Sequence, residues 1–218
     1  MDVDGEHRRL ELDRDLLSLI QRGVDPQELA VGAALEGELV APLQPGKIVG
    51  IGLNYLDHIR ESNLPQPSQP LVFAKFPSSV TGPNDPIVVD LELTTHVDWE
   101  VELGVIVGRR MRRVDVAAAL DHVFGYTACN DVSARDVQFS ESQWTRGKSF
   151  DTFCPLGPVV VAFCSRNFTL EPGDLLLTGT PWGCGYFMDP PRALELGDVV
   201  ECEVERIGVL RNTFAAAR

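Results

Sequence analysis

With 218 residues, 44% of them hydrophobic and 23% charged, the chain has the composition of a globular protein of one large or two small domains. Its 19 basic and 32 acidic side chains give a net charge of −13, which argues against nucleic-acid and membrane-surface partners, and no apolar run approaches the roughly 20 residues that span a bilayer. Five widely spaced cysteines without a C-x-x-C pair, and an N-terminus without an apolar stretch, predict a protein of the reducing cytoplasm.

Residues 1–45 are predicted to form a small N-terminal module. Asp13 is placed to cap a short helix with one apolar face, and Gly23 is placed to end it. Residues 46–218 are predicted to form the main domain.

The main domain is predicted to be rich in short strands. Residues 54–61 and the Ala-rich stretch 114–124 have helical spacing. Apolar or alternating runs, bounded mostly by Gly and Pro, predict strands at 48–52, 71–74, 97–107, 154–161, 174–178 and 198–204. Many short strands with few helices indicate an α+β protein that is mainly β.

Two carboxylates lie close together in the predicted strand 97–107. Glu100 and Glu102 are two residues apart, so their side chains share one face, opposite a row of apolar residues. One interpretation is that this face is the solvent side of a half-buried strand. Against it, no positive residue stands beside them on this face, and like charges so close are costly unless a cation joins them.

The segment 129–138 offers a third carboxylate. If it is helical, Asp131, Arg135 and Gln138 fall on one stripe. This stripe is either an ordinary surface Asp–Arg pair or a site for a metal ion and the oxygen atoms of a bound acid. Three carboxylates without a nearby His or Cys are hard ligands, which suit Mg²⁺, Mn²⁺ or Ca²⁺ better than zinc.

His58 and Glu61 are three residues apart in the predicted helix 54–61. They lie either on a solvated helix face or form a dyad, in which the carboxylate orients the imidazole as a general base.

Two further segments carry candidate groups for binding an anion. Lys148 follows a glycine, but the first glycine of a phosphate-binding loop is missing, so it is either a surface lysine or a cation for a carboxylate or oxyanion. The turn 178–183 around Thr180 offers hydroxyls and backbone N–H groups to an anion, although a plain tight turn would use the same glycines.

Together and in this order, the motifs resemble the fumarylacetoacetate hydrolase family, in its branch of short bacterial acylpyruvate hydrolases and 2-hydroxyhepta-2,4-diene-1,7-dioate isomerases. The matching stretches run from about residue 46 to near the C-terminus: GIGLNYLDHIRE (50–61), FAKF (73–76), GPNDPI (82–87), DWEVELG (98–104), GYTACNDVSARD (125–136), GKSFD (147–151), PGDLLLTGTP (172–181) and GDVV (197–200).

The resemblance implies a mixed β-sandwich roll that assembles as a homodimer, and an enzyme that uses Mg²⁺ or Mn²⁺ (with Ca²⁺ as a substitute in crystals) on a small 2-oxo acid. The family's functional residues fall on metal ligands Glu100, Glu102 and Asp131, on catalytic residues His58, Glu61 and Lys148, and on substrate-binding residues Arg135, Gln138 and Thr180.

The expected reaction is hydrolysis of a carbon–carbon bond in an acylpyruvate, such as fumarylpyruvate or acetylpyruvate. The same site would serve an isomerase or an oxaloacetate decarboxylase, and the alternative of another class is a non-catalytic metal- or ligand-binding protein. Family members carry several dozen more residues near 161–164. Either the protein lacks that element or the sequence is closed over residues of a longer chain, and we favour the second.

Overall fold

The computed structural model of the protein describes residues 2–3, 6–10, 15–24, 30–34, 39–157 and 169–217. It is mostly sheet with few helices, which confirms the predicted α+β, mainly β class. The junction near 161–164 and the second half of the predicted strand 154–161 lie outside the described residues. Within the described ranges, no helix is both long and apolar enough to cross a membrane.

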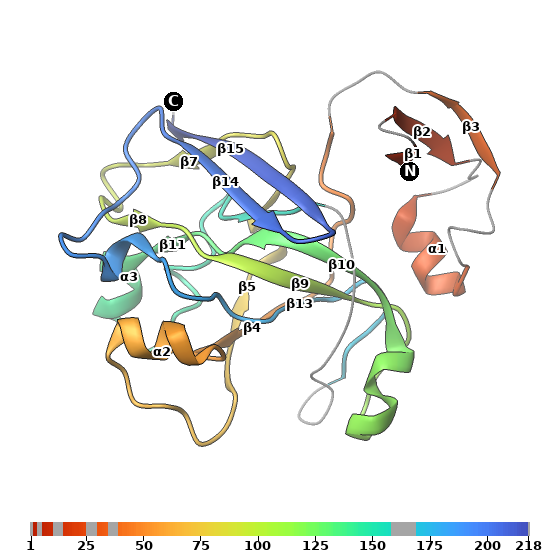
Figure 1. Cartoon of the computed structure of the whole chain (residues 1–218), viewed down its shortest axis with the longest axis horizontal. Coiled ribbons are helices and arrows are strands. Elements are labelled where there is room, and N and C mark those ends of the chain that lie inside the picture. Colours follow the sequence, from red (N-terminus) through yellow and green to blue (C-terminus); the bar gives the residue numbers. More distant parts are fainter. Residues whose placement is uncertain are drawn as a thin grey trace.

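A five-stranded mixed sheet forms the centre of the molecule (Figure 1). In spatial order its strands are β10 (Val123–Asn130), β9 (Val101–Val107), β13 (Leu175–Leu177), β4 (Ile48–Gly52) and β5 (Leu71–Lys75). β13 and β4 pair in parallel, and the other neighbours pair antiparallel. The strands predicted at 48–52, 71–74 and 174–178 are confirmed to within one residue at each end.

The predicted strand 97–107 is broken in two. Its first part, β8 (Val97–Asp98), leaves the central sheet and pairs antiparallel with β11 (Ser133–Ala134). Trp99 and Glu100 lie between β8 and β9. The side chain of Asp98 accepts the backbone N–H of Trp99 at 2.9 Å, and such a local bond competes with the strand ladder.

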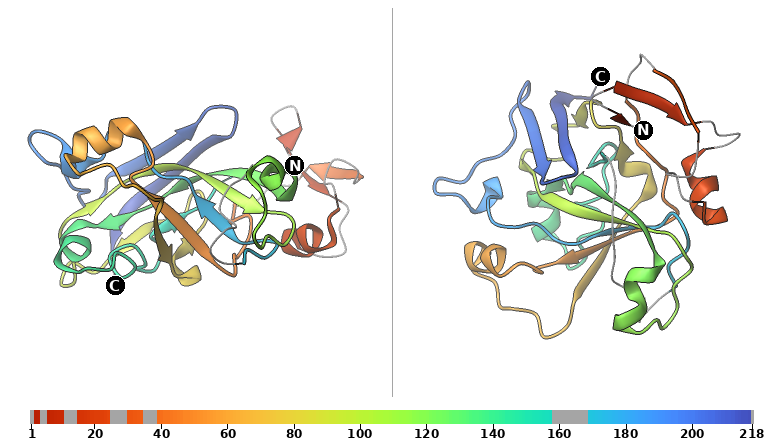
Figure 2. Two further views of the ribbon diagram at one scale, coloured as in Figure 1. Left: turned by 90° about the horizontal axis from the view of Figure 1, so that it is seen from below. Right: turned by 45° about the vertical axis from the view of Figure 1, so that its right-hand side comes forward.

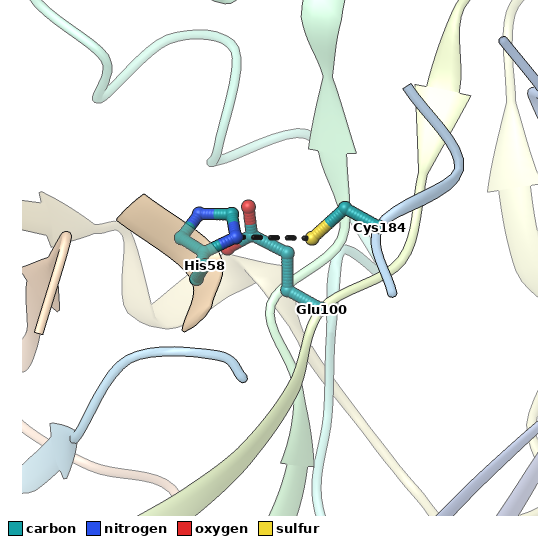
Figure 3. Close-up of side chains that lie close together, drawn as sticks. All are labelled: His58, Glu100 and Cys184. Carbon is teal, nitrogen blue, oxygen red and sulfur yellow. Dashed lines mark hydrogen bonds between the residues drawn. The ribbon is translucent and has the colours of Figure 1, made fainter. Parts of the chain in front are cut away.

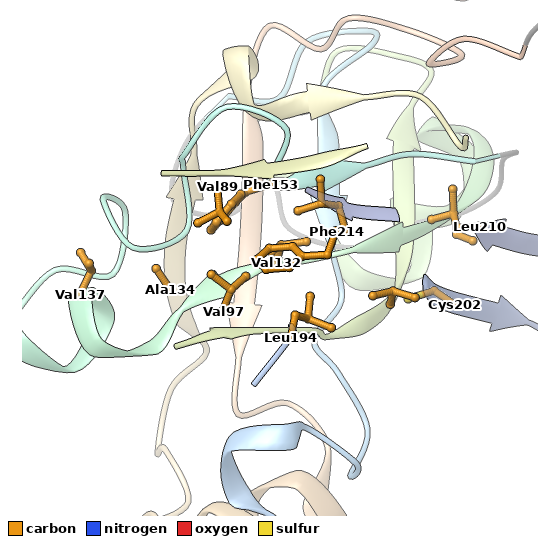
Figure 4. Close-up of a cluster of buried hydrophobic side chains, with 13 residues drawn as sticks. Val89, Val97, Val132, Ala134, Val137, Phe153, Leu194, Cys202, Leu210 and Phe214 are labelled. Atoms are coloured by element: carbon orange, nitrogen blue, oxygen red, sulfur yellow. The ribbon is translucent and has the colours of Figure 1, made fainter. Parts of the chain in front are cut away.

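A second sheet covers β9 and β10 (Figure 1). It consists of β14 (Val199–Val204), β15 (Gly208–Ala216) and β7 (Ile87–Val89), with β14 and β15 antiparallel and β15 and β7 parallel. Between the sheets lies a buried apolar core, shown in Figure 4, whose members include Val97, Val132, Phe153, Leu210 and Phe214.

Several short elements lie beside these sheets. β6 (Val80–Thr81) pairs in parallel with β12 (Cys154–Pro155). The helices α2 (Leu56–Ser62) and α3 (Arg135–Ser140) lie near each other at one end of the molecule (Figure 1), and 3-10 helices span Pro77–Ser79, Val116–His122 and Gly185–Phe187. The helix predicted at 114–124 is therefore shorter than expected, because its C-terminal end continues into β10.

The N-terminal segment lies at the other end of the molecule, away from α2 and α3 (Figures 1 and 2). Within its described residues, the elements are a small sheet and one helix: β1 (Asp2–Val3), β2 (Glu6–Leu10), β3 (Val31–Ala34) and α1 (Leu16–Arg22).

The helix α1 is capped by Asp15, and not by Asp13 as predicted, because the side chain of Asp15 accepts the backbone N–H of Ser18 at 2.8 Å. Gly23 ends the helix in the left-handed conformation, with a φ of 66°, as predicted. Ile20 is only 1% exposed and belongs to a core cluster with Ile48 and Ile106 of the central sheet. This helix is therefore anchored by apolar burial against the central sheet.

Candidate active site

Three buried carboxylates meet at the place where β9 begins and the neighbouring strand β10 ends. Glu100 precedes β9, Glu102 lies in it, and Asp131 directly follows β10, which pairs antiparallel with β9. The backbone N–H of Asp131 donates to the carbonyl oxygen of Glu100 at 2.8 Å. Each residue offers one carboxylate oxygen within 4.8 Å of the others, and none is more than 5% exposed. The solvent-face interpretation of Glu100 and Glu102 is therefore wrong.

The prediction that Asp131, Arg135 and Gln138 lie on one face of a helix is also wrong. Asp131 is the residue after a strand, and α3 begins only at Arg135, because the intervening residues form β11. The three side chains still converge on one site. The guanidinium of Arg135 donates to the amide oxygen of Gln138 at 3.0 Å, and both residues are buried.

Two buried lysines neutralise the carboxylates. The ammonium of Lys148 lies 2.7 Å from a Glu100 oxygen and 2.8 Å from an Asp131 oxygen, so this lysine is not the surface residue of the plainer interpretation. Lys75 donates to the second oxygen of Asp131 at 2.7 Å. Sequence reasoning missed Lys75, although alternation in β5 places it on the same buried face as Phe73.

Arg135 forms the third cationic contact. Its guanidinium lies 2.7 Å from a carboxylate oxygen of Glu100 and 2.7 Å from one of Asp98. Asp98, which sequence reasoning also missed, accepts in addition the backbone N–H groups of Gly185 at 2.8 Å and Tyr186 at 3.3 Å. Asp98 thus ties Arg135 and the 184–187 segment to the end of β8.

These contacts set the ionisation of the site. Burial raises the pKa of Glu102 well above its usual value, and the neighbouring carboxylates of Asp131 and Glu100 raise it further. Burial would also raise the pKa of Glu100, but Lys148 and Arg135 outweigh burial and lower that pKa. When Glu102 is protonated, the network of three cations and three carboxylates is neutral: Lys75, Lys148 and Arg135 against Asp98, Glu100 and Asp131.

The His58–Glu61 pair is formed as a buried dyad beside the carboxylates. Nδ1 of His58 lies 2.7 Å from a Glu61 oxygen, and the other Glu61 oxygen accepts the backbone N–H of Gly183 at 2.8 Å. An ionised Glu61 can only accept hydrogen bonds, so Nδ1 of His58 is then the donor, and a neutral imidazole in this arrangement has its lone pair on Nε2. His58 is 6% exposed, which rules out the solvated-face interpretation.

A small cavity of about 20 Å³ connects these groups, with room for about one water molecule or ion. Its lining combines polar and apolar side chains, among them His58, Glu100, Glu102, Arg135, Gln138, Lys148, Thr180, Phe73, Trp144 and Phe187. Phe187 packs edge-on against the ring of His58, with the ring centroids 5.7 Å apart.

The turn at Thr180 does not use its backbone as expected. The backbone N–H of Gly179 donates to a carboxylate oxygen of Glu102 at 2.7 Å, so the anion it binds belongs to the protein itself. Gly179 has a φ of +95°, and a Cβ atom there would lie 2.8 Å from the carbonyl oxygen of Ile51. The hydroxyl of Thr180 donates to the carbonyl oxygen of Pro181 at 3.2 Å.

The three carboxylates fit a hard divalent ion by their chemistry and spacing. They offer only oxygen donors, they converge within 4.8 Å, and they border the cavity through Glu100 and Glu102. The ammonium of Lys148 is the cation that joins Glu100 and Asp131 in this structure. A bound ion would compete with that ammonium for the same oxygens.

Glu102→Gln is expected to separate metal binding from folding. The amide is isosteric with a protonated carboxyl group, and its oxygen can still accept the N–H of Gly179. Loss of groups that only support metal ligands costs roughly 10- to 100-fold in metal affinity, so loss of a ligand should cost at least as much. Calorimetric titration with Mn²⁺ measures the affinity, and thermal unfolding in EDTA measures stability. Undiminished Mn²⁺ affinity would remove Glu102 from the ligand set.

Comparison with known proteins identifies the family of the chain. The family model described as "Fumarylacetoacetate (FAA) hydrolase C-terminal" matches residues 47–163 and 160–215. Its two matched parts meet near residues 161–164, where the sequence was expected to lack residues that family members carry. The mitochondrial oxaloacetate tautomerase fahd2 of Xenopus laevis is 41% identical over 215 residues, which cover 80% of this chain and 67% of the relative.

Two solved structures show the same fold. The fumarylacetoacetate hydrolase of Exiguobacterium antarcticum superposes with a TM-score of 0.84 at 36% identity, covering 99% of this chain and 94% of the other. The 5-carboxymethyl-2-hydroxymuconate delta-isomerase of Mycobacterium smegmatis superposes with a TM-score of 0.74 at 32% identity, covering 87% and 86%. With this fold and the matched family model, the chain belongs to the fumarylacetoacetate hydrolase family.

Proposed function

We propose that this enzyme of the fumarylacetoacetate hydrolase family moves a proton within a 2-oxo acid such as oxaloacetate, interconverting its enol and keto forms with the help of a divalent metal. The proposal is carried by the His58–Glu61 pair, which sets one oriented imidazole beside three buried carboxylates. It is supported by the relative named an oxaloacetate tautomerase and by the similar structure named an isomerase.

The proton transfer can be assigned to atoms of the chain. In the keto-to-enol direction, Nε2 of His58 would take a proton from the carbon next to the keto group. The electron pair left on that carbon forms a carbon–carbon double bond, the carbonyl π pair moves to oxygen, and a proton returned to that oxygen completes the enol. Arg135 and Lys148 line the cavity and would stabilise the negative oxygen. A divalent ion on the three carboxylates would act as a Lewis acid.

The charge of the site supports an anionic substrate. If Glu102 is ionised together with the other three carboxylates of the network, the side chains carry four negative and three positive charges. A bound dication would then leave one net positive charge. That charge would attract a 2-oxo acid in spite of the protein's net charge of −13.

Hydrolysis of a carbon–carbon bond in an acylpyruvate, the reaction expected from the sequence, is the second candidate. The same dyad can take a proton from water instead of carbon, and one of the similar structures is named a fumarylacetoacetate hydrolase. The two reactions differ in what His58 deprotonates and in whether the carbon chain is cut.

Removing divalent metal is expected to reduce turnover to the uncatalysed rate, and Mn²⁺ or Mg²⁺ is expected to restore it. The test follows the ultraviolet absorbance of enol oxaloacetate as it converts to the keto form, with metal, with EDTA, and with EDTA followed by excess Mn²⁺. Pyruvate is assayed in parallel to detect decarboxylation, and acetylpyruvate and fumarylpyruvate are assayed for cleavage.

The outcomes separate the candidates. Metal-dependent tautomerisation without pyruvate supports the proposal. Faster metal-dependent cleavage of an acylpyruvate would establish the hydrolase, and pyruvate formation would establish a decarboxylase. Metal binding without turnover of any of these acids would favour a binding protein.

A further inference from the structure

A second group of metal-ligating side chains combines His58 and Cys184 with Glu100 of the three-carboxylate site. Cys184 is 1% exposed, and its sulfur lies 3.8 Å from Nδ1 of His58. A nitrogen of His58, the sulfur of Cys184 and a carboxylate oxygen of Glu100 all lie within 4.8 Å of one another. Figure 3 shows the three side chains turned toward a common point from three separate segments of the chain.

The spacing of this group suits a tetrahedral metal ion. Zinc binds sulfur at about 2.3 Å and imidazole nitrogen at about 2.0–2.1 Å, so two such ligands on one tetrahedral ion lie about 3.6 Å apart. The observed separation of sulfur and nitrogen, 3.8 Å, is close to that value. One sulfur, one nitrogen and one oxygen donor favour a borderline-soft ion such as Zn²⁺ and disfavour Mg²⁺, which prefers oxygen alone.

We propose that His58, Cys184 and Glu100 form an inhibitory site for zinc and chemically similar dications. Its ligand set differs from that of the three-carboxylate site, although Glu100 belongs to both. Three protein ligands leave a fourth corner of the tetrahedron for water. The inference goes beyond the proposed reaction, because it concerns a metal that the oxygen-only site does not select.

The inhibition follows from where the protons go. Zinc at Nδ1 takes the lone pair of that nitrogen, so the imidazole proton must move from Nδ1 to Nε2, and the Cys184 thiol releases its proton to solvent. Nε2 then carries a proton and cannot accept another one. The hydrogen bond between Nδ1 and Glu61, 2.7 Å long in this structure, is lost at the same time.

The first test reads metal binding directly and does not depend on any enzymatic activity. Co²⁺ is added to the full chain in the presence of saturating Mg²⁺, and the absorption spectrum is searched for a thiolate-to-cobalt charge-transfer band. We expect the band in the wild type and in Cys202→Ala, which removes another buried thiol in the apolar core. We expect its loss in Cys184→Ala. A wild type without the band, or a Cys184→Ala variant that keeps it, would overturn the proposal.

The second test uses inhibition by Zn²⁺ of the Mg²⁺-loaded enzyme, with each variant compared to its own zinc-free rate. The Cys184→Ala substitution is expected to raise the inhibitory zinc concentration by roughly tenfold or more, since even residues that only support a ligand contribute 10- to 100-fold to affinity. Equal zinc sensitivity of wild type and variant would place inhibition at the carboxylate site and contradict the proposal. If no turnover exists to inhibit, the proposed function fails while the cobalt spectra still decide this inference.

Discussion

Replacing His58 with Gln is expected to lower turnover of enol oxaloacetate by roughly 10²- to 10⁴-fold, the usual contribution of a positioned general base. Binding of Mn²⁺ should persist, because the oxygen ligands of the three-carboxylate site do not include His58. Steady-state kinetics measure the first effect and calorimetric titration with Mn²⁺ measures the second. Loss of Mn²⁺ binding in this variant would show that His58 is a ligand of the catalytic ion.

Glu61→Gln provides the matched comparison. The amide oxygen can still accept the Nδ1 proton of His58, but the amide NH₂ then faces the backbone N–H of Gly183, which donates to the carboxylate at 2.8 Å in the wild type. We expect a smaller loss of turnover than in His58→Gln, with the same Mn²⁺ affinity. A Glu61→Gln enzyme slower than His58→Gln would contradict a purely orienting role for this carboxylate.

Replacing Lys75 with Met is expected to lower the free energy of unfolding by about 3–5 kcal/mol when metal is absent, because the variant leaves a buried carboxylate without one of its cations. Lys75 and Asp131 are both fully buried and 2.7 Å apart. Urea unfolding in EDTA measures the loss. Lys47→Met removes a lysine from an Asp174 pair whose lysine is 43% exposed, and it should cost no more than about 1 kcal/mol.

The same Lys75→Met variant should gain more stability from Mn²⁺ than the wild type gains. With one positive charge removed beside Asp131, a dication replaces the missing compensation and binds more tightly. A ligand at 100 times its Kd stabilises a protein by about 2.7 kcal/mol, so the difference between the two proteins is measurable at one fixed Mn²⁺ concentration. An equal gain in both would argue that Asp131 is not a ligand of the ion.

The strands of the fold were predictable where a strand has a simple pattern of burial. β4 and β5 have apolar runs bounded by glycine or proline, and they lie where predicted. The break after Asp98 was not predictable from alternation, because it depends on a side chain that bonds to its own backbone neighbour. β15 was missed because its buried face includes the polar Asn212 while the apolar Val209 is exposed, so its sequence lacks a regular apolar alternation.

The members of the site were easier to find than their arrangement. Residues that are close in sequence are also neighbours in the structure. This holds for Glu100 and Glu102, two residues apart, and for His58 and Glu61, three residues apart. The partner of a distant carboxylate depends on strand pairing, which local periodicity does not contain. For that reason Lys75, which lies 56 residues from the carboxylate that it binds, was not assigned a role.

The internal pairing of the buried charges has a consequence for the life of the protein. Small zinc domains stay unfolded until their metal arrives, because nothing else holds their ligands together. Here ammonium and guanidinium groups already compensate the acidic ligands, so the polypeptide can fold without a bound metal ion. The supply of metal ions would then determine the fraction of folded molecules that is active, and not the amount of folded protein.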